Sequence, residues 1–140
     1  MYKKILLPID GSKIAEKAAK EAFELGNLTG AEVIIMTVVE QNQYIGIPAG
    51  EAIAQINELL WEEAKDTIKK FSNLNKYDIK TSEKIVEGNP PQEIVKMAED
   101  ENTDLIVIGS TGKSGFDKFV LGSVADKVTN KSKCSVLVVH

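Results

Sequence analysis

A cluster of glycine and hydroxyl residues follows the apolar run 105–108 in the last third of the chain. Gly109 and Gly112 are separated by two residues, and Gly122 with Ser123 follow after nine more. An apolar strand, a glycine loop and a helix in this order point backbone N–H groups and a helix N-terminus at an anion. These residues therefore predict a site that holds phosphate.

Two familiar phosphate-binding patterns do not fit this loop. Gly112-Lys113-Ser114 supplies the second half of a P-loop, but the first glycine would have to stand at the position of Val107. The dinucleotide pattern G-x-G-x-x-G also fails, because no other glycine completes it. From spacing alone, Gly109 and Gly112 are also compatible with ordinary turn residues, and Gly122 with a helix start.

Lysine supplies all 17 basic residues of the chain, and arginine is absent. A bidentate guanidinium clamp is therefore not available, so backbone amides, hydroxyls and lysine must bind any phosphate. Lys113 in the loop is a candidate for that charge, and equally well a solvated surface residue. The net charge of −4 argues against nucleic acid as a partner.

No set of residues has the types and spacing of a catalytic centre. His140 is the only histidine and the last residue, so a Ser-His-Asp triad is not available. Cys134, the single cysteine, lacks a histidine partner, and a small, partly buried residue is the simpler interpretation. No cluster has the spacing of metal ligands.

The length of 140 residues predicts one domain, residues 1–140. A single cysteine excludes a disulfide within the chain and favours a reducing, cytosolic setting. No run approaches the ~20 apolar residues of a membrane span, and Met1-Tyr2-Lys3-Lys4 before a strand-like segment lacks the shape of a signal peptide. We therefore expect a cytoplasmic protein with no membrane partner.

Strand and helix patterns alternate along the chain. Apolar runs at 5–7, 32–39, 78–87, 105–108 and 135–139 predict five strands, with amphipathic helices between them, the longest at 51–74 and the last at 120–132. This alternation predicts an open, mostly parallel α/β sheet. Ligands of such sheets bind beyond the carboxyl ends of the strands, where the strand order reverses. If the order is 3-2-1-4-5, Asp10 and Gly109 face the same crevice.

Local signals predict where several elements begin and end. Ser12 or Asp10 is expected to cap the first helix. In Gly88-Asn89-Pro90-Pro91, the second proline suits the first helical position of the next helix. Segment 40–50 is expected to be a long loop. The long helix carries one apolar stripe, formed by Ile53, Ile56, Leu60, Ala64, Ile68 and Phe71.

The chain resembles the universal stress protein family, specifically its nucleotide-binding branch, whose marker is G-x2-G-x9-G-[ST]. Gly109, Gly112, Gly122 and Ser123 carry the match. Supporting segments extend over essentially the whole chain, at 4–10, 88–95, 105–108, 121–124 and 136–139. The marker shows no departure, whereas the 40–50 loop and the missing arginines are individual to this chain.

The resemblance implies a Rossmann-like five-stranded sheet with helices on both faces, ATP in the crevice, and homodimers joined through the last strand, Val136-Leu137-Val138-Val139. Mg²⁺ would accompany the ATP, held mainly by its phosphates. The ribose and adenine end of the nucleotide would meet Asp10 and Val38, and the nucleotide would lie over Ile108 and Gly109. The phosphates would be held by Gly112, Gly122, Ser123 and Val124. Pro8 is the remaining residue of the predicted site. A side chain at Gly112 or Gly122 would keep backbone amides away from phosphate oxygens.

The function expected from these features is an ATP-binding stress or signalling module, in which nucleotide stabilises one conformation or dimer. At most slow ATP hydrolysis is expected. The alternative is a structural homodimer of the same fold that binds no nucleotide. An ATP pyrophosphatase would need Ser-Gly-Gly-x-Asp-Ser where this chain has Asp10-Gly11-Ser12-Lys13-Ile14, and a phospho-receiver would need an acidic pair where Asp10 stands alone.

Overall fold

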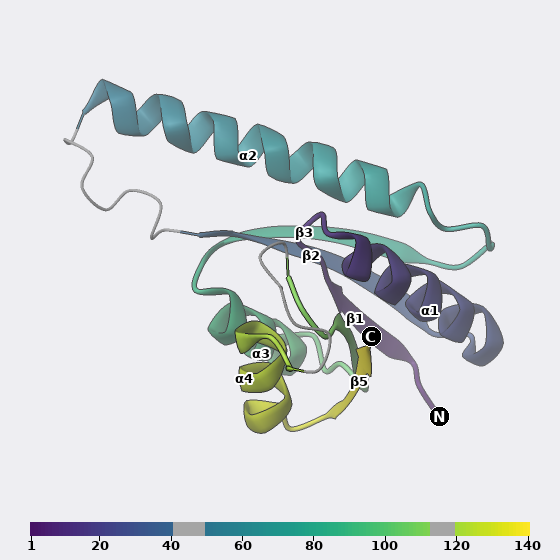
Figure 1. The fold of residues 1–140 in the computed structure, drawn as a ribbon. Helices are drawn as coiled ribbons and strands as arrows, with labels where there is room; N and C mark the ends of the chain where they lie inside the picture. Colours follow the sequence, from purple (N-terminus) through teal and green to yellow (C-terminus); the bar gives the residue numbers. More distant parts are fainter. Residues whose placement is uncertain (41–49, 113–119) are drawn as a thin grey trace.

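The computed structural model describes residues 1–40, 50–112 and 120–140. The described elements are β1 (Lys4–Pro8), α1 (Lys13–Thr29), β2 (Glu32–Glu40), α2 (Glu51–Ser72), β3 (Thr81–Gly88), α3 (Pro90–Asp100), β4 (Leu105–Gly109), α4 (Ser123–Lys131) and β5 (Ser135–Val139). The strands form one parallel sheet in the order β3-β2-β1-β4-β5 (Figure 1). The predicted α/β fold and strand order are confirmed.

The central strands are apolar on both faces because helices cover both faces of the sheet. Successive residues of β1 point to opposite sides, so Ile5 and Leu7 join one core cluster and Leu6 joins the other. Helices α1 and α2 pack on the first face, and α3 and α4 on the second (Figure 1). The crossover helices therefore account for the continuous apolar runs of the strands.

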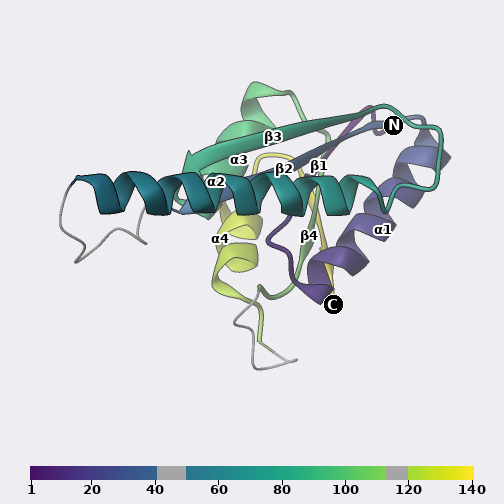
Figure 2. The same ribbon diagram turned by 90° about the horizontal axis from the view of Figure 1, so that it is seen from above.

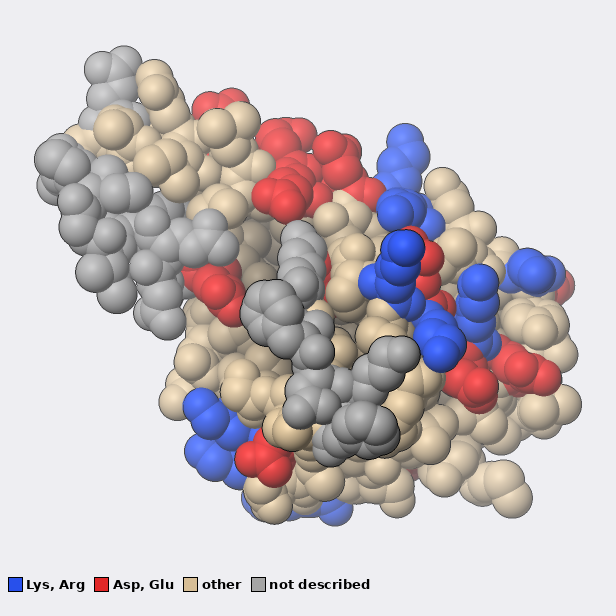
Figure 3. Space-filling view, in the orientation of Figure 1, with Lys and Arg blue, Asp and Glu red and all other residues tan. Residues whose placement is uncertain are grey.

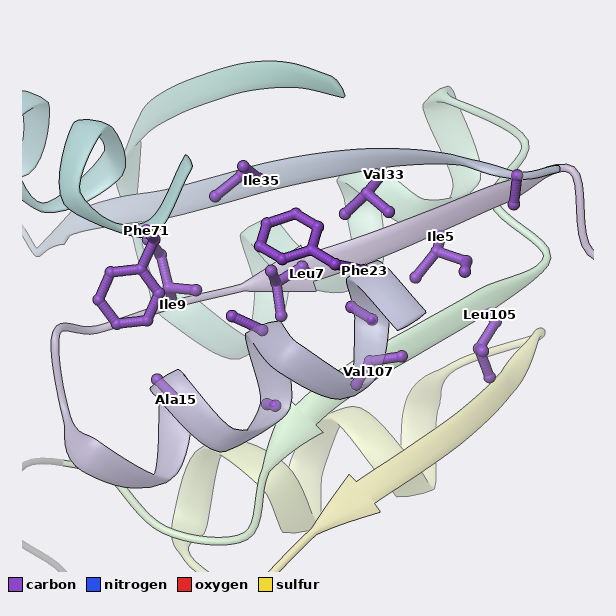
Figure 4. Packing of buried hydrophobic residues seen from close by; sticks show 14 of the residues in the cluster. Ile5, Leu7, Ile9, Ala15, Phe23, Val33, Ile35, Phe71, Leu105 and Val107 are labelled. Carbon is purple, nitrogen blue, oxygen red and sulfur yellow. The ribbon is translucent and has the colours of Figure 1, made fainter. Parts of the chain in front are cut away.

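The larger core lies between the sheet and α1. Phe23 of α1 packs beside Leu7 and Val33, and Phe71 from the end of α2 lies near Ile9 (Figure 4). Small residues on the buried face of α1 let this helix lie close to the strands: Ala15, Ala18, Ala19, Ala22 and Gly26. Full burial of one aromatic side chain contributes about 2–3 kcal/mol, so this face is a main source of stability.

Side-chain caps determine where two helices begin. Ser12 is the N-cap of α1, and its Oγ accepts the Ala15 N–H at 3.1 Å. Asn89 caps α3, and Pro90 rather than the second proline takes the first helical position. The predicted assignment of that position to the second proline is therefore wrong by one residue, because the cap lies directly before Pro90.

Three of the boundaries predicted above differ from the structure by two or three residues. The last helix begins at Ser123, with Gly122 as its N-cap, and not at position 120. The long helix ends at Ser72, two residues earlier than expected. The third strand begins at Thr81 and not at position 78, because its pairing with β2 starts opposite Val33. The expected loop at 40–50 lies almost entirely outside the described residues.

Only the C-terminal half of α2 contributes to the core. Ala64, Ile68 and Phe71 are buried, whereas Ile53 and Ile56 of the predicted stripe stay partly exposed. Figures 1 and 2 show the reason, since the N-terminal turns of α2 extend past the ends of β2 and β3. In the described parts of the chain, no helix combines the length and the apolar character required to cross a membrane.

Candidate functional site

A cavity of about 560 Å³ lies at the carboxyl ends of β1, β2 and β4. Strand order reverses between β1 and β4, so the cavity occupies the switch point of the sheet. Ligand sites of α/β proteins occur at this position, and small-molecule cavities typically have volumes of about 300–1,000 Å³. The cavity therefore has the place and the size of a ligand site.

The structure gathers the predicted site residues around this one cavity. Its lining includes Pro8, Asp10, Val38, Ile108, Gly109, Gly112, Gly122, Ser123 and Val124. Lys113, also predicted for the site, lies outside the described residues. Segments about 100 residues apart in the sequence thus meet at one place, although their role in binding stays a prediction.

Gly109 allows α1 to approach the end of β4 closely. A Cβ at this position would lie 2.7 Å from Ile14 Cγ2 and 3.5 Å from the Ala15 backbone nitrogen. Gly109 has no positive φ, so the requirement here is space and not an unusual backbone conformation. This glycine brings the N-terminus of α1, with Asp10 just before it, up to the edge of the cavity.

Gly112 and Gly122 allow the loops around the cavity to contact each other. A Cβ on Gly112 would lie 2.8 Å from Asp10 Oδ2, and one on Gly122 would lie 3.0 Å from the Ser110 carbonyl oxygen. The sequence suggested that these glycines leave room for phosphate. The structure adds a more immediate reason, because a side chain at either position would first collide with the protein itself.

Backbone hydrogen bonds hold the start of the glycine loop in place. The Ser110 N–H donates to the Val139 carbonyl at 2.8 Å, and the Gly122 N–H donates to the Ser110 carbonyl at 2.7 Å. Ser110 is buried. The loop that leaves β4 is therefore fastened to the last strand on one side and to the start of α4 on the other.

The N-terminus of α4 opens into the cavity without a side-chain cap. Gly122 is its N-cap residue, and the first hydrogen bond of the helix runs from the Asp126 N–H to the Gly122 carbonyl. The amides of Ser123, Val124 and Ala125 therefore precede the helical ladder, and all three residues line the cavity. In contrast, Ser12 caps α1 and Asn89 caps α3. The N-terminus of α4 is suited to an anion.

Asp10 lies in the cavity wall just after the end of β1. Its Oδ1 accepts the Ser12 N–H at 3.0 Å, a local turn that orients the carboxylate. The sequence left open whether Asp10 or Ser12 caps α1, and the structure assigns the cap to Ser12. Asp10 is therefore placed beside the cavity instead of being used as the helix cap.

Sequence reasoning missed the walls that α2 and α3 contribute. Leu60, Glu63 and Thr67 of α2 and Ile94 of α3 line the cavity. Among these residues, only Leu60 belongs to the apolar stripe that was predicted for the long helix. Nothing in a helical period tells whether such a stripe faces a sheet or a ligand.

The charged residues in the described lining are all acidic: Asp10, Glu40 and Glu63. Figure 3 shows acidic side chains gathered over the middle of α2, with lysines toward its C-terminal end. Within residues 1–40, 50–112 and 120–140, no group of three or more His, Cys, Asp and Glu side chains is placed to hold a metal ion. An anionic ligand therefore meets amide groups at α4 and carboxylates at the other walls.

Comparison with known proteins gives a consistent result along the whole sequence. Residues 1–140 match the Universal stress protein family. Universal stress protein MJ0531 of Methanocaldococcus jannaschii is 41% identical over 140 residues, covering 99% of this chain and 82% of the relative. The solved structure of MJ0577 from the same organism has a TM-score of 0.88 at 39% identity, covering 99% of this chain and 96% of that one.

A further solved structure is similar and contains a nucleotide. It is a universal stress protein in complex with cAMP, with a TM-score of 0.66 and 27% identity, covering 99% of this chain and 97% of the other. The glycine marker, the parallel sheet with its cavity at the switch point, and the match over the full sequence agree. The chain belongs to the universal stress protein family.

Proposed function

We propose that this protein binds ATP together with Mg²⁺ in the cavity at the switch point, and that it acts as a small nucleotide-dependent stress or signalling module. The observation that carries the proposal is the N-terminus of α4, which has no side-chain cap and whose first three residues line the cavity. A solved relative that holds cAMP supports a nucleotide as the class of ligand.

The phosphates would lie at the glycine loop and the start of α4. The amides of Ser123 and Val124 would donate to phosphate oxygens, and the Ser123 hydroxyl is a further donor. The Oδ1 of Asp126, in the first turn of α4, accepts a hydrogen bond from Asn130 Nδ2 further along the helix, at 3.2 Å. Lys113 is proposed as an additional positive charge.

The nucleoside would lie between the ends of β1 and β2. Asp10 is a hydrogen-bond acceptor at the cavity wall, and a carboxylate suits the hydroxyl donors of ribose. Val38 and Pro8 supply apolar surface for the adenine ring, with Ile108 beneath the nucleotide. Apolar walls with a few fixed polar groups are the usual composition of small-molecule sites.

The acidic lining of the cavity favours ATP that carries Mg²⁺ over free ATP. Asp10, Glu40 and Glu63 would repel the negative charge of free ATP. The described lining contains no lysine that would offset this repulsion. Mg²⁺ coordinated by the phosphates reduces that charge and needs few protein ligands. We therefore expect Mg-ATP to bind more tightly than ATP in excess EDTA.

Calorimetry and nucleotide release test the proposal directly. The purified protein would be denatured and its supernatant analysed for adenine nucleotide, and the nucleotide-free protein would then be titrated with Mg-ATP. Binding to the folded state alone raises the unfolding free energy by about 2.7 kcal/mol at 100 times the Kd. Nucleotide binding is contradicted if no nucleotide is released and millimolar Mg-ATP produces neither heat nor a higher melting temperature.

The second candidate function is a homodimer that binds a partner and no nucleotide. One observation favours it: among the described strands β5 lies at the edge of the sheet, and Leu137 is 37% exposed, so a second copy would pair along this edge. The same titration separates the two functions, because a structural dimer would give no response to Mg-ATP.

A further inference from the structure

The first cavity extends over both faces of the sheet. Successive residues of β2 point to opposite faces, so Val38 lies on the face covered by α3 and α4, and Thr37 lies on the face covered by α1 and α2. We call the part of the cavity on the Thr37 face its α2 side. The α2 side is lined by Thr37 and by four residues of α2: Leu60, Glu63, Ala64 and Thr67. The glycine marker and the other residues predicted for the site include none of these.

Thr37 has a buried hydroxyl that opens into the cavity. The residue is 8% exposed and lines the cavity, and its hydroxyl makes no hydrogen bond within the described parts of the chain. Among those parts, only the Thr103 oxygen is both unpartnered and fully enclosed, so the Thr37 oxygen reaches the cavity surface. A buried hydroxyl normally has a partner, because leaving it unpaired costs free energy. The Thr37 hydroxyl is therefore placed to bind a polar atom of a ligand.

Thr67 of α2 presents a second hydroxyl on the same side. Two other helical threonines, Thr29 and Thr129, each donate to the carbonyl four residues earlier, at 2.7 Å. A hydroxyl bonded in this way is occupied by its own helix. Within the described residues Thr67 makes no such bond, so its hydroxyl is available to a ligand in the cavity.

Glu63 is the acidic residue that α2 contributes to the described lining. Glu40 follows Val38 by two residues in β2 and therefore points to the opposite face of the sheet from Thr37. An ionised carboxylate accepts hydrogen bonds and cannot donate them. Its two oxygens accept from several donors, so Glu63 can accept an N–H of a ligand in addition to its existing interaction.

The α2 side is where the base of a bound nucleotide would lie. Helix α4, proposed to hold the phosphates, packs on one face of the sheet, and α2 packs on the other (Figure 1). The phosphates and the base are the two ends of a nucleotide, and the nucleoside would cross the ends of β1 and β2. The edge of the base therefore meets Glu63 and the two hydroxyls, with Leu60 and Ala64 as apolar surface around them.

We propose that Glu63 and Thr37 select the base of the nucleotide, and that they favour a 6-aminopurine over a 6-oxopurine. This inference rests on the proposed function, because it specifies which base the same cavity binds. The exocyclic amino group of adenine donates to the Glu63 carboxylate, whereas the 6-oxygen of hypoxanthine meets an acceptor and finds no proton to share. The Thr37 and Thr67 hydroxyls can donate or accept, so they bind ring nitrogens of either purine.

Three nucleotides with the same ribose and phosphates test this selection. The nucleotide-free, full-length protein would be titrated by calorimetry with Mg-ATP, with Mg-ITP and with the Mg²⁺ complex of purine riboside triphosphate. Because the phosphates are identical, the ratios of the affinities report on the base alone. We expect Mg-ATP to bind about tenfold more tightly than Mg-ITP, as one hydrogen bond to a charged group would give. Purine riboside triphosphate, with only hydrogen at the same carbon, should lie between the two.

Glu63→Gln identifies the carboxylate as the source of the preference. A glutamine amide both donates and accepts, so it can bind the 6-oxygen as well as the 6-amino group, and the ratio of the ATP and ITP affinities should fall to about one or two. Glu62→Gln is the matched control. Glu62 is an equally exposed neighbour that pairs with Lys65 and does not line the cavity, so this variant should keep the tenfold ratio.

Thr37→Val tests the hydroxyl separately. Without ligand this variant should melt at the same or a higher temperature, because the hydroxyl that it removes has no partner in the protein. Its affinities for Mg-ATP and Mg-ITP should both fall by about threefold to tenfold, and Thr37→Ser should restore them. Unchanged affinities in Thr37→Val would show that the hydroxyl does not contact the base.

The outcomes separate this inference from the proposed function. Equal affinities for Mg-ATP and Mg-ITP in the unmodified protein, or a tenfold ratio that persists in Glu63→Gln, would overturn the selection by Glu63 and leave nucleotide binding in place. Absence of binding by all three triphosphates would refute the proposed function, and the inference with it.

Discussion

Three glycines at the first cavity let other parts of the site pack closely, because they have no side chain. Gly109, Gly112 and Gly122 each lie where a Cβ would collide with another part of the site, and none of them has a positive φ. Their common property is therefore close packing and not backbone freedom. The marker that predicts a phosphate site also describes how α1, Asp10 and the loop after β4 come together.

Gly122→Val should weaken Mg-ATP binding by about tenfold or more, a loss of about 1.4 kcal/mol or more. A Cβ at this position already lies 3.0 Å from the Ser110 oxygen and 3.1 Å from the Thr111 Cα, so the start of α4 must move away from the loop. Titration calorimetry measures the affinity, and thermal unfolding monitors the fold.

Gly30→Ala is the matched control for this variant. Gly30 ends α1 with a φ of 78°, and a Cβ there meets nothing within 4 Å. Alanine should therefore cost about 1–2 kcal/mol of backbone strain, with no effect at the cavity. Normal binding in Gly122→Val, or equal loss of binding in both variants, would contradict the role given to Gly122.

At the scale of elements, one side chain joins β1 to the turn before β4. Asp104 Oδ2 accepts the Lys3 N–H at 2.7 Å and the Lys4 N–H at 2.9 Å, and the Asp104 N–H donates to the Lys4 carbonyl at 2.9 Å. The hydrogen bonds from Lys3 and Lys4 lower the pKa of Asp104 from its ordinary value of 3.8. The charged carboxylate is therefore the form that holds these strands in register.

Asp104→Asn should lower the free energy of unfolding at neutral pH by a small amount, because the group is partly exposed to solvent. Its pKa is lower in the folded state than in the unfolded state. The stabilising effect is thus present above the ordinary pKa of 3.8 and disappears as the pH falls through the folded value.

Urea unfolding between pH 7 and pH 2 measures the difference between wild type and this variant. The difference should be constant near neutrality and should shrink below about pH 4. A difference that grows on acidification would contradict the assignment.

At the scale of the whole molecule, the edge strand β5 connects the outer surface to the proposed nucleotide site. The Val139 carbonyl accepts the Ser110 N–H, and Ser110 in turn contacts Gly122. Val138 packs against the core on the α3 and α4 side, whereas Leu137 is 37% exposed. A substitution at Leu137 therefore tests the proposal that a second copy pairs along β5, and it does so without disturbing the core.

Leu137→Lys should convert a β5-paired homodimer into monomers, because each chain would place a charge at the proposed contact. Multi-angle light scattering measures the mass, and circular dichroism checks that the fold is kept. Leu59→Lys, an equally apolar and 69% exposed residue of α2, is the control and should leave the mass unchanged. If the wild type is dimeric and Leu137→Lys has the same mass, pairing through β5 is wrong.

Much of the fold follows from the sequence alone. The continuous apolar runs of β1 and β4, separated by helical patterns, require a parallel sheet covered on both faces, and the structure has this sheet. The glycine spacing and Asp10 also identified residues that line one cavity. Local signals succeed here because a strand buried on both faces and a glycine loop are encoded by neighbouring residues.

Tertiary structure decided what depends on contacts between distant segments. Helix α2 was predicted to carry one apolar stripe, yet its N-terminal turns extend past the sheet, and Leu60 and Thr67 line the cavity. A periodic pattern specifies that a helix has an apolar face, but the surface which that face meets is determined only when the whole chain has packed.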